Sequence, residues 1–363
     1  MPLTVAVVVE HAWHPVPGGT GTAVDATLRA LLEHDQLVLT GIAAAHRSPA
    51  DVVIDAANHW LPRPLLYEGW HRLGWPRSGA EADVIWAPAM AVPPRTKPMV
   101  VTVHDVDFLE HPERLSRRGA AFFPRAWQAA LDRADVIAVP SAVVSHAAQK
   151  HGADPAKVEV VPWGVDDKPA AADRVESMRA RLKLAEPFVL WVGTAEPRKN
   201  LAGLVAAIAP LDVPLVVVGP DGWGVDVDDV LAPLGARVTR LGRLDRADLE
   251  AAYALATVFA FPSFDEGFGL PVLEAMAQGT AVVTSRGTAT EEVAGSAAIL
   301  VDPHDVDSIR AGLSEALGDA ARRAECEVLG RQRAAEANWA ETASSYRRIF
   351  ERLGSDQESG STT

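Results

Sequence analysis

The chain has 363 residues, of which 48% are hydrophobic and 23% charged, and its formal net charge is −14. At about 100–200 residues per domain this length suggests two domains, each able to bury a core. The negative charge argues against nucleic acid as a partner, and the single cysteine, Cys326, excludes a disulfide framework and a cysteine-based zinc site.

The first apolar run, Leu3–Val9, has no basic segment before it and is too short for a signal peptide or a membrane span. We therefore expect a cytoplasmic protein, and a peripheral contact with the inner face of a membrane stays open.

Short apolar runs alternate with helical stretches along the first part of the chain. The predicted strands are Leu3–Val9, Asp83–Ala87, Met99–His104, Val136–Val139 and Val158–Val161. The predicted helices are Gly21–Glu33, Arg118–Asp132 and Ala142–His151. Such alternation predicts a parallel sheet with helices on both faces.

The pattern breaks between Trp163 and Glu186 and then restarts. The second set of predicted strands is Phe188–Val192, Leu215–Val218, Arg237–Arg240, Val258–Phe261, Ala281–Thr284 and Ala298–Val301. The helices are Asn200–Ala209, Arg246–Leu255, Leu270–Gln278, Val306–Leu317, Ala320–Asn338 and Glu341–Leu353. We therefore predict domains at 1–165 and 187–338, a linker at 166–186, a last helix at 339–353 and a disordered tail at 354–363. Two such domains facing each other across a cleft would bind ligands at the carboxyl ends of their strands.

The strongest chemical signal lies between Phe261 and Thr280. A glycine-rich loop carries Glu266, and the helix after it begins with Pro271 in its first turn and holds Glu274 in the same turn. The N-terminus of this helix offers unpaired N–H groups to an anion, and the two carboxylates could accept sugar hydroxyls. Taken alone, the same residues fit a second interpretation equally well, in which Glu266 lies in a solvated loop and Glu274 only complements the helix dipole.

Further candidates follow other predicted strands. Arg198 and Lys199 could neutralise a diphosphate, although two cations there also suit an ordinary helix start. His104 stands at a strand end, where a lone histidine is more often structural. His11 and His14 follow the first strand, where a further histidine contact could arise.

These segments, in this order, resemble family 4 of the retaining glycosyltransferases, whose Glu-x7-Glu motif matches Glu266 and Glu274. The resemblance extends to Val101–Asp105, Val136–Ser141, Val158–Asp166, Val192–Asn200, Ala281–Thr284, Glu291–Gly295 and Leu300–Pro303. It implies the GT-B fold, in which two Rossmann-like domains form an acceptor domain and a donor domain and the last helix crosses back to the first domain.

The resemblance implies a role for each matched residue. Glu274 would bind the donor ribose, Glu266 the transferred sugar, and Arg198 and Lys199 the donor diphosphate, while His104 would act against the sugar or the acceptor. The candidate catalytic residues are therefore His104, Glu266, Arg198 and Lys199. The other candidate donor-binding residues are Gly18, Gly19, Gly193, Gly242, Arg243, Leu244, Gly267, Phe268, Gly269 and Leu270.

The resemblance also implies a reaction. A hexosyl unit, with mannosyl favoured, would pass with retention from a nucleotide-diphosphate sugar to a hydroxyl of a glycan or lipid-linked glycan during cell-envelope polysaccharide assembly. GDP-mannose is the favoured donor and UDP-sugars come next. The nucleotide sugar is a co-substrate, so no cofactor is expected. No residue is placed as a covalent nucleophile, which favours a same-face attack assisted by the leaving phosphate.

Asp105 and Asp107 form an Asp-x-Asp pair, which holds a divalent metal in another glycosyltransferase fold. Because Arg198 and Lys199 would already supply positive charge, we expect no metal.

Three alternatives stay open: a sugar-nucleotide epimerase of the same fold, a phosphorylase with a cofactor-bearing lysine, and an inactive sugar-nucleotide-binding protein.

A segment without a usable motif carries Trp60, Trp70 and Trp75 together with Arg63 and Arg72. It suits a lipid acceptor or a membrane interface, or else a partly packed excursion of the first domain.

Overall fold

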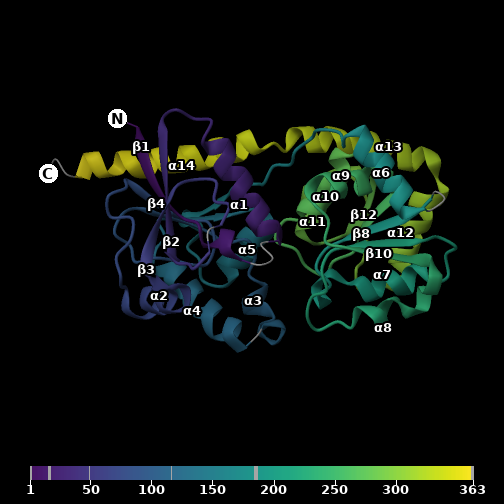
Figure 1. Ribbon diagram of the computed structural model, residues 1–363, viewed down its shortest axis with the longest axis horizontal. Helices are drawn as coiled ribbons and strands as arrows, with labels where there is room; N and C mark the ends of the chain where they lie inside the picture. Colours follow the sequence, from purple (N-terminus) through teal and green to yellow (C-terminus); the bar gives the residue numbers. More distant parts are fainter. Residues whose placement is uncertain (1, 15–17, 49, 116, 184–186, 361–363) are drawn as a thin grey trace. The chain divides into compact units, whose positions relative to one another are not determined.

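The computed structural model describes residues 2–14, 18–48, 50–115, 117–183 and 187–360. The chain divides into two compact units, one made of Met1–Gly164 together with Trp339–Thr363 and the other of Val165–Asn338 (Figure 1). Each unit is built around its own parallel sheet.

The first unit contains seven parallel strands in the order β3-β2-β1-β4-β5-β6-β7. The strands are β1 (Leu3–Val8), β2 (Leu37–Ala45), β3 (Ala56–Pro62), β4 (Val84–Ala87), β5 (Met99–Thr102), β6 (Val136–Val139) and β7 (Val158–Val160). The helices are α1 (Gly18–Leu31), α2 (Arg63–Glu68), α3 (Asp107–Glu110), α4 (Arg117–Arg133), α5 (Ala142–Lys150) and α14 (Trp339–Gly360), and the shorter turns are η1 (Glu10–Trp13), η2 (Gly69–Leu73), η3 (Pro112–Arg114) and η4 (Pro155–Lys157).

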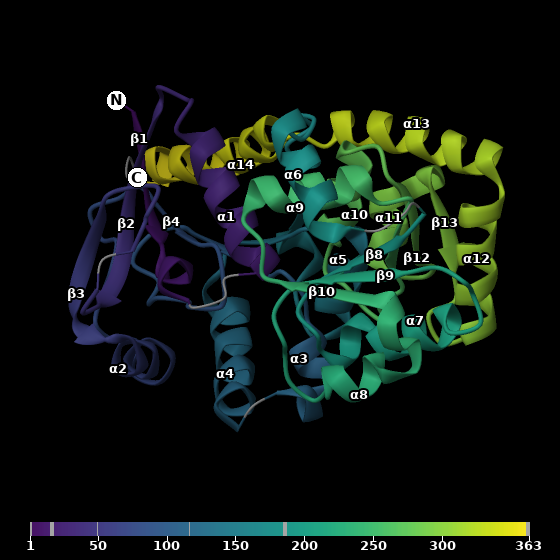
Figure 2. The same cartoon turned by 45° about the vertical axis from the view of Figure 1, so that its right-hand side comes forward.

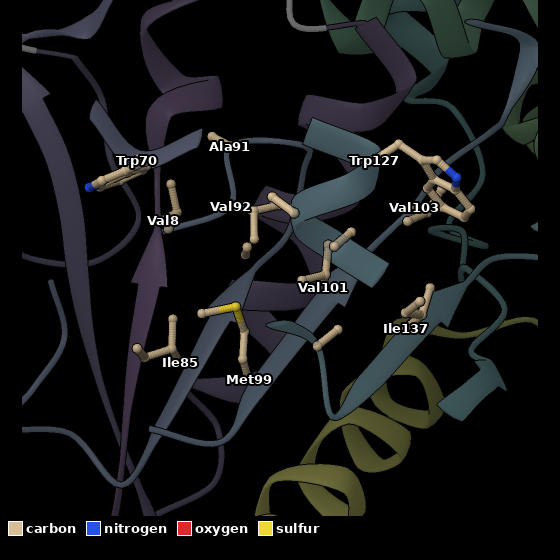
Figure 3. Close-up of a cluster of buried hydrophobic side chains, with 14 of the residues drawn as sticks. Val8, Trp70, Ile85, Ala91, Val92, Met99, Val101, Val103, Trp127 and Ile137 are labelled. Atoms are coloured by element: carbon tan, nitrogen blue, oxygen red, sulfur yellow. The ribbon is translucent and has the colours of Figure 1, made fainter. Parts of the chain in front are cut away.

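Alternate residues of β1 serve two different cores, as the pleat of a strand requires. Val5 and Val7 belong to the core that includes the apolar residues of α1 and α14. Ala6 and Val8 belong to the core on the opposite face, where Trp70 and Trp127 are packed (Figure 3). The sheet is therefore covered on both faces, as the alternating sequence pattern predicts.

Helix α14 belongs to the first unit although it is last in the sequence. The Tyr346 hydroxyl lies 2.8 Å from Oγ1 of Thr102 on β5, and the Tyr346 ring packs on Trp86 of β4.

The prediction of a disordered tail from residue 354 is wrong as far as Gly360, because α14 continues to that residue. Once packing has nucleated a helix, each further turn adds at low cost. Residues 361–363 lie outside the described residues.

The second unit contains six parallel strands in the order β10-β9-β8-β11-β12-β13. They are β8 (Val189–Val192), β9 (Leu215–Val218), β10 (Val238–Gly242), β11 (Val258–Phe261), β12 (Ala281–Ser285) and β13 (Ala298–Val301). The helices are α6 (Ala172–Leu182), α7 (Leu201–Ile208), α8 (Val227–Leu231), α9 (Arg246–Leu255), α10 (Leu270–Ala277), α11 (Ala289–Ala294), α12 (Val306–Gly318) and α13 (Ala320–Glu336), and the shorter turns are η5 (Pro197–Lys199), η6 (Ala232–Arg237) and η7 (Gly295–Ala297). Figure 2 shows α7 and α8 on one face of this sheet and α9 and α10 on the other.

The segment predicted as a linker contains a packed helix. Met178 and Leu182 of α6 are buried, and Arg174 of the same helix donates to the Asp248 carboxylate on α9 at 3.1 Å. The second unit therefore begins at Val165.

Two strands escape the sequence prediction. Strand β2 is rich in Ala and Gly, and β3 is mostly exposed at the edge of the sheet, so neither shows the continuous apolar run of a buried strand. Small residues are needed where the two strands meet, because a Cβ on Gly41 would lie 2.8 Å from the Cβ of Ala56.

Candidate functional site

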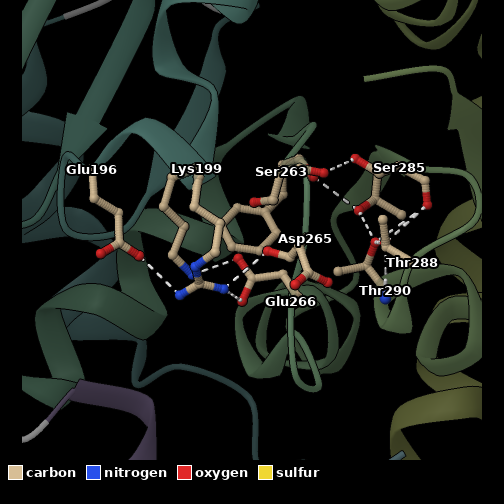
Figure 4. Close-up of polar contacts among 11 residues, drawn as sticks. Glu196, Lys199, Ser263, Asp265, Glu266, Ser285, Thr288 and Thr290 are labelled. Atoms are coloured by element: carbon tan, nitrogen blue, oxygen red, sulfur yellow. Dashed lines mark hydrogen bonds and ion pairs between the residues drawn. The ribbon is translucent and has the colours of Figure 1, made fainter. Parts of the chain in front are cut away.

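A buried cluster of charges lies at the carboxyl ends of β8 and β11, which are neighbours in the second sheet. Turn η5 follows β8 and carries Arg198 and Lys199, while Glu266 lies in the loop between β11 and α10. Nζ of Lys199 donates to Oε1 of Glu266 at 2.5 Å, and a guanidinium nitrogen of Arg198 donates to Oε2 at 3.0 Å. Each oxygen of the Glu266 carboxylate therefore has its own cation (Figure 4).

A second carboxylate completes the cluster. Arg198 donates to Glu196 at 2.8 Å and to the carbonyl oxygen of Asp265 at 2.9 Å. Burial by itself would raise the pKa of the Glu266 carboxyl, but the charges of Arg198 and Lys199 hold it below its usual value. Two cations thus balance two carboxylates. Sequence reasoning missed Glu196, although an acidic residue two positions before Arg198 is a usable signal.

The loops around this cluster are tied together by side chains. Asn200 adopts a left-handed backbone conformation with φ 53°, and its amide donates to the carbonyl oxygens of Pro262 at 3.0 Å and Pro303 at 2.8 Å. Ser285 Oγ donates to the Ser263 carbonyl at 2.6 Å (Figure 4). These bonds fix the backbone that leads to Glu266, and a functional side chain on a fixed backbone is preorganised.

Glu274 forms a separate cluster. It is the fifth residue of α10, so it lies beyond the first turn in which we predicted it, because one helical turn takes 3.6 residues. The Tyr253 hydroxyl donates to Oε2 at 3.0 Å, and Arg246 forms an ion pair with Oε1. The carboxylate therefore does not complement the dipole of its own helix. It is buried and held from both sides.

Sequence reasoning also missed Arg246 and Tyr253. Arg246 is the first residue of α9, where a cation opposes the helix dipole, and this anomaly could have indicated a carboxylate partner. Burial opposes the charge of Arg246, yet Glu274 and Glu250 raise the pKa of its guanidinium. Burial raises the pKa of the Tyr253 phenol, and the Glu274 charge raises it further, so this hydroxyl stays protonated and donates.

The glycines of the candidate site have different physical roles. Gly269 has φ 98°, and a Cβ there would lie 2.6 Å from Cγ2 of Thr290, so both the backbone conformation and the packing require a glycine at this position. Gly193 follows β8, and its carbonyl oxygen would lie 1.9 Å from a Cβ on Gly219. Gly242 ends β10 with φ 64°.

The other predicted donor-binding and catalytic residues lie beside Glu266, after β10, or in the first unit. Gly267, Phe268 and Leu270 are buried in the loop and at the start of α10. Arg243 and Leu244 follow β10, and Arg243 is exposed. The first unit holds three more predicted residues: Gly18 and Gly19, which begin α1, and His104.

His104 lies two residues beyond the end of β5. Its Nε2 is 2.6 Å from the carbonyl oxygen of Pro88, and its ring packs edge-on against Trp163. Burial lowers the pKa of the imidazole, although Pro88 and Asp105 oppose part of this shift.

Within the described residues, no group of three or more His, Cys, Asp or Glu side chains is placed to hold a metal ion. The expectation that no metal is needed stays a prediction.

The three tryptophans of the aromatic segment have different environments. Trp70 is fully buried, and its indole N–H donates to the Pro76 carbonyl at 3.1 Å, so it is a core residue (Figure 3). Trp60 and Trp75 are exposed and meet edge to face with their ring centroids 5.9 Å apart. The segment therefore has a packed side and an exposed side.

Two units that each contain a parallel sheet covered by helices define the class of the fold, and solved structures agree. The sucrose-phosphate synthase of Thermosynechococcus elongatus is 22% identical, with a TM-score of 0.78, over 98% of this chain and 100% of that chain. HepE of Anabaena, solved with UDP and glucose, is 18% identical, with a TM-score of 0.77, over 96% of this chain and 100% of that chain. The fold is GT-B.

The sequence comparisons give the family. Residues 17–168 match the model of Glycosyltransferase Family 4, and residues 174–333 match the model of Glycosyl transferases group 1. The O-antigen chain mannosyltransferase B of Escherichia coli is 34% identical over 312 residues, which cover 78% of this chain and 81% of that protein. The chain belongs to glycosyltransferase family 4 and is a glycosyltransferase. None of the described helices combines the length and the apolar character needed to cross a membrane.

Proposed function

We propose that this protein is a retaining hexosyltransferase that moves a mannosyl unit from a nucleotide-diphosphate sugar to a hydroxyl of a glycan or lipid-linked glycan. The observation that carries the proposal is the buried cluster of Arg198, Lys199 and Glu266 at the carboxyl ends of two parallel strands. The mannosyl unit and the glycan acceptor are supported by the E. coli relative, whose name is that of an O-antigen chain mannosyltransferase. A nucleotide donor is supported by HepE, which was solved with UDP.

The donor diphosphate would contact the two cations. When the bond between sugar and phosphate breaks, negative charge gathers on the departing diphosphate, so fixed cations stabilise the transition state more than the ground state. Arg198 suits this role because its planar guanidinium can donate two parallel bonds to a phosphate. In the resting protein Glu196 and Glu266 hold both cations in place before the donor arrives.

The donor ribose would bind at Glu274. A carboxylate offers about four lone-pair sites. In Glu274, Arg246 occupies one site on Oε1 and Tyr253 occupies one site on Oε2. The remaining sites could accept two hydroxyl protons from a ribose diol. Tyr253 and Arg246 would fix the carboxylate in the orientation that this contact requires.

The chemical step would be a same-face displacement. The bond from the anomeric carbon to the phosphate oxygen breaks, the bond to the acceptor oxygen forms, and the acceptor proton passes to an oxygen of the leaving phosphate. This step needs no covalent nucleophile. It also needs no metal if Arg198 and Lys199 supply the positive charge.

A thermal-shift screen against GDP, UDP, ADP and TDP tests donor binding, since a ligand at 100 times its Kd adds about 2.7 kcal/mol. Incubation with GDP-mannose and a mannose-ended glycan, followed by NMR of the anomeric proton, tests transfer and retention. We expect α-linked product in the presence of EDTA. Loss of transfer with EDTA, restored by Mn²⁺ or Mg²⁺, would contradict the metal-independent step.

The alternatives give other results in the same assays. Isomerised donor in the absence of acceptor would indicate an epimerase. Near-ultraviolet absorbance of a lysine-bound cofactor would indicate a phosphorylase. Tight nucleotide binding without any transfer would indicate an inactive sugar-nucleotide-binding protein.

We infer that the first unit also touches an anionic membrane surface. Trp60, Leu65, Leu73 and Trp75 are 68%, 58%, 75% and 50% exposed within one short segment. Exposed aromatic and aliphatic side chains flanked by arginine suit the interface of a bilayer, and Arg77 beside them is exposed as well. Cosedimentation with anionic vesicles should fall in Leu73→Ser and remain in the control Leu32→Ser, whose leucine is also exposed. Equal sedimentation of both variants would refute the inference.

A further inference from the structure

Two histidines of the first unit each have a buried ring nitrogen that has no hydrogen-bond partner in the described part of the chain. His11 lies in η1, directly after β1, and His104 lies just after β5. Strand β4 runs between β1 and β5 in the sheet, so the carboxyl ends of these strands lie at one edge. Nδ1 of His11 and Nδ1 of His104 are both buried, and neither has a hydrogen-bond partner among the described residues.

The hydrogen bonds at the other nitrogens fix the tautomers. The Pro88 carbonyl can only accept, so Nε2 of His104 carries the hydrogen. The Asp25 carboxylate accepts from Nε2 of His11 at 2.9 Å. In a neutral imidazole with hydrogen on Nε2, Nδ1 carries a lone pair and can only accept. With the hydrogen on Nε2, the neutral form of each ring therefore presents an unused acceptor at Nδ1.

The two rings lie close enough to influence each other. Burial is the main reason why the pKa of His104 is lowered, and His11 is one of the groups that lower it further. The lowered pKa keeps His104 neutral. Buried acceptors without donors are rare in folded proteins, and a pair of them at the carboxyl edge of a parallel sheet lies where such sheets bind ligands.

We propose that His11 binds a hydroxyl group of the sugar substrate beside His104, accepting its O–H on Nδ1, and that Asp25 holds His11 in the tautomer which leaves that atom free to accept. This proposal rests on the proposed function. The new elements are His11 and Asp25. The hydroxyl could belong to the donor sugar or to the acceptor glycan, since both offer the same chemistry.

Two amide substitutions distinguish the role of Nε2 of His11 from the role of its Nδ1. Gln reaches the position of Nε2 and can still donate to Asp25, but it has no acceptor at the position of Nδ1. Asn places an oxygen near the position of Nδ1 and cannot reach Asp25. If His11 binds a hydroxyl, His11→Gln should lower kcat/KM by about 10- to 100-fold at unchanged Tm, and His11→Asn should keep more of the activity. If His11 only ties η1 to α1, the order of the two variants is reversed.

The substrate can be identified with deoxy analogues. A deoxy sugar that lacks the bound hydroxyl should be used equally well by wild type and His11→Gln, whereas the parent sugar should distinguish them. Deoxy acceptors and deoxy donors form the two arms of the experiment. The matched control is His111→Gln, which changes a partly exposed histidine paired with Glu113 in the same unit and should leave kcat/KM unchanged.

The outcomes separate the two hypotheses. Transfer by the wild type combined with full activity of His11→Gln on every substrate would overturn the role of His11 and leave the proposed function standing. Absence of transfer by the wild type would overturn the proposed function, and this inference with it. A lower Tm in His11→Gln, with the loss of activity repaired by stabilising conditions, would also assign His11 a structural role only.

Discussion

Glu266→Gln removes one negative charge from the buried cluster and little else. The change leaves Arg198 paired with Glu196 and removes the carboxylate that Lys199 contacts directly, while only 13% of the Lys199 side chain is exposed. Breaking a buried ion pair by removing one partner costs about 3–5 kcal/mol. Because the amide oxygen can still accept a hydrogen bond, we expect the lower value, about 3 kcal/mol. For a domain of this size the Tm of the second unit should then fall by about 6–12 °C.

The pH dependence has a defined sign. The pKa of the Glu266 carboxyl is lower in the folded protein than in the unfolded chain. Its contribution to stability is therefore fully present above the unfolded value of about 4.3 and is lost as the pH falls through the folded pKa. The difference in unfolding free energy between wild type and Glu266→Gln should be constant from neutral pH down to about pH 5 and shrink below about pH 4.

The same variant changes ligand binding in the opposite direction. Without the Glu266 charge, the two cations attract a diphosphate more strongly, so GDP or UDP should raise the Tm of Glu266→Gln at least as much as that of the wild type. Turnover should fall, because the proposed contact with the transferred sugar is weakened.

Differential scanning calorimetry with and without nucleotide measures these effects. Asp307→Asn is the control, since its ion pair with Arg310 is exposed and should contribute less than about 0.5 kcal/mol. Unfolding of Glu266→Gln within about 0.5 kcal/mol of the wild type would refute the argument from a buried pair.

Three further predictions follow from named contacts. Arg198→Ala should lower the single-turnover rate at saturating donor by about 10²–10³, and Arg198→Lys should restore only part of it; a wild-type rate in the Ala variant would exclude transition-state stabilisation. Tyr253→Phe removes the donor to Glu274 and should weaken nucleotide binding several-fold in calorimetric titration, at a stability cost of about 1 kcal/mol; an unchanged Kd would contradict the orienting role. Trp70→Ala should cost about 3–5 kcal/mol in denaturant unfolding, while Trp60→Ala should stay within about 0.5 kcal/mol; equal costs would contradict the division of this segment into packed and exposed sides.

The sequence predicts the buried parts of the fold closely. Strands β6, β9, β11 and β13 have the bounds that their apolar runs predict. Each is buried on both faces, so every residue must be apolar and the run begins and ends with the strand. The Glu-x7-Glu segment likewise indicates the family, because its loop glycines, helix start and two carboxylates recur together at a fixed spacing.

What the sequence leaves open depends on contacts between distant segments. Glu266 meets Lys199 across 67 positions, and Glu274 meets Arg246 across 28, so neither pairing follows from local periodicity. The order of the strands brings these loops to one edge of the sheet. Only that arrangement decides which carboxylate neutralises which cation.

The aromatic segment shows the same limit. Its tryptophans look alike in the sequence, yet Trp70 is buried and Trp60 is exposed, because the tertiary structure packs Trp70 into the core of the first sheet and leaves Trp60 outside that core. Strands β2 and β3 escaped prediction because an edge strand and its Ala-rich neighbour need no continuous apolar run. Residue types and local spacing thus determine the buried strands and the family, whereas ion pairing, burial at the edges and the partners of each functional side chain are decided when distant segments pack together.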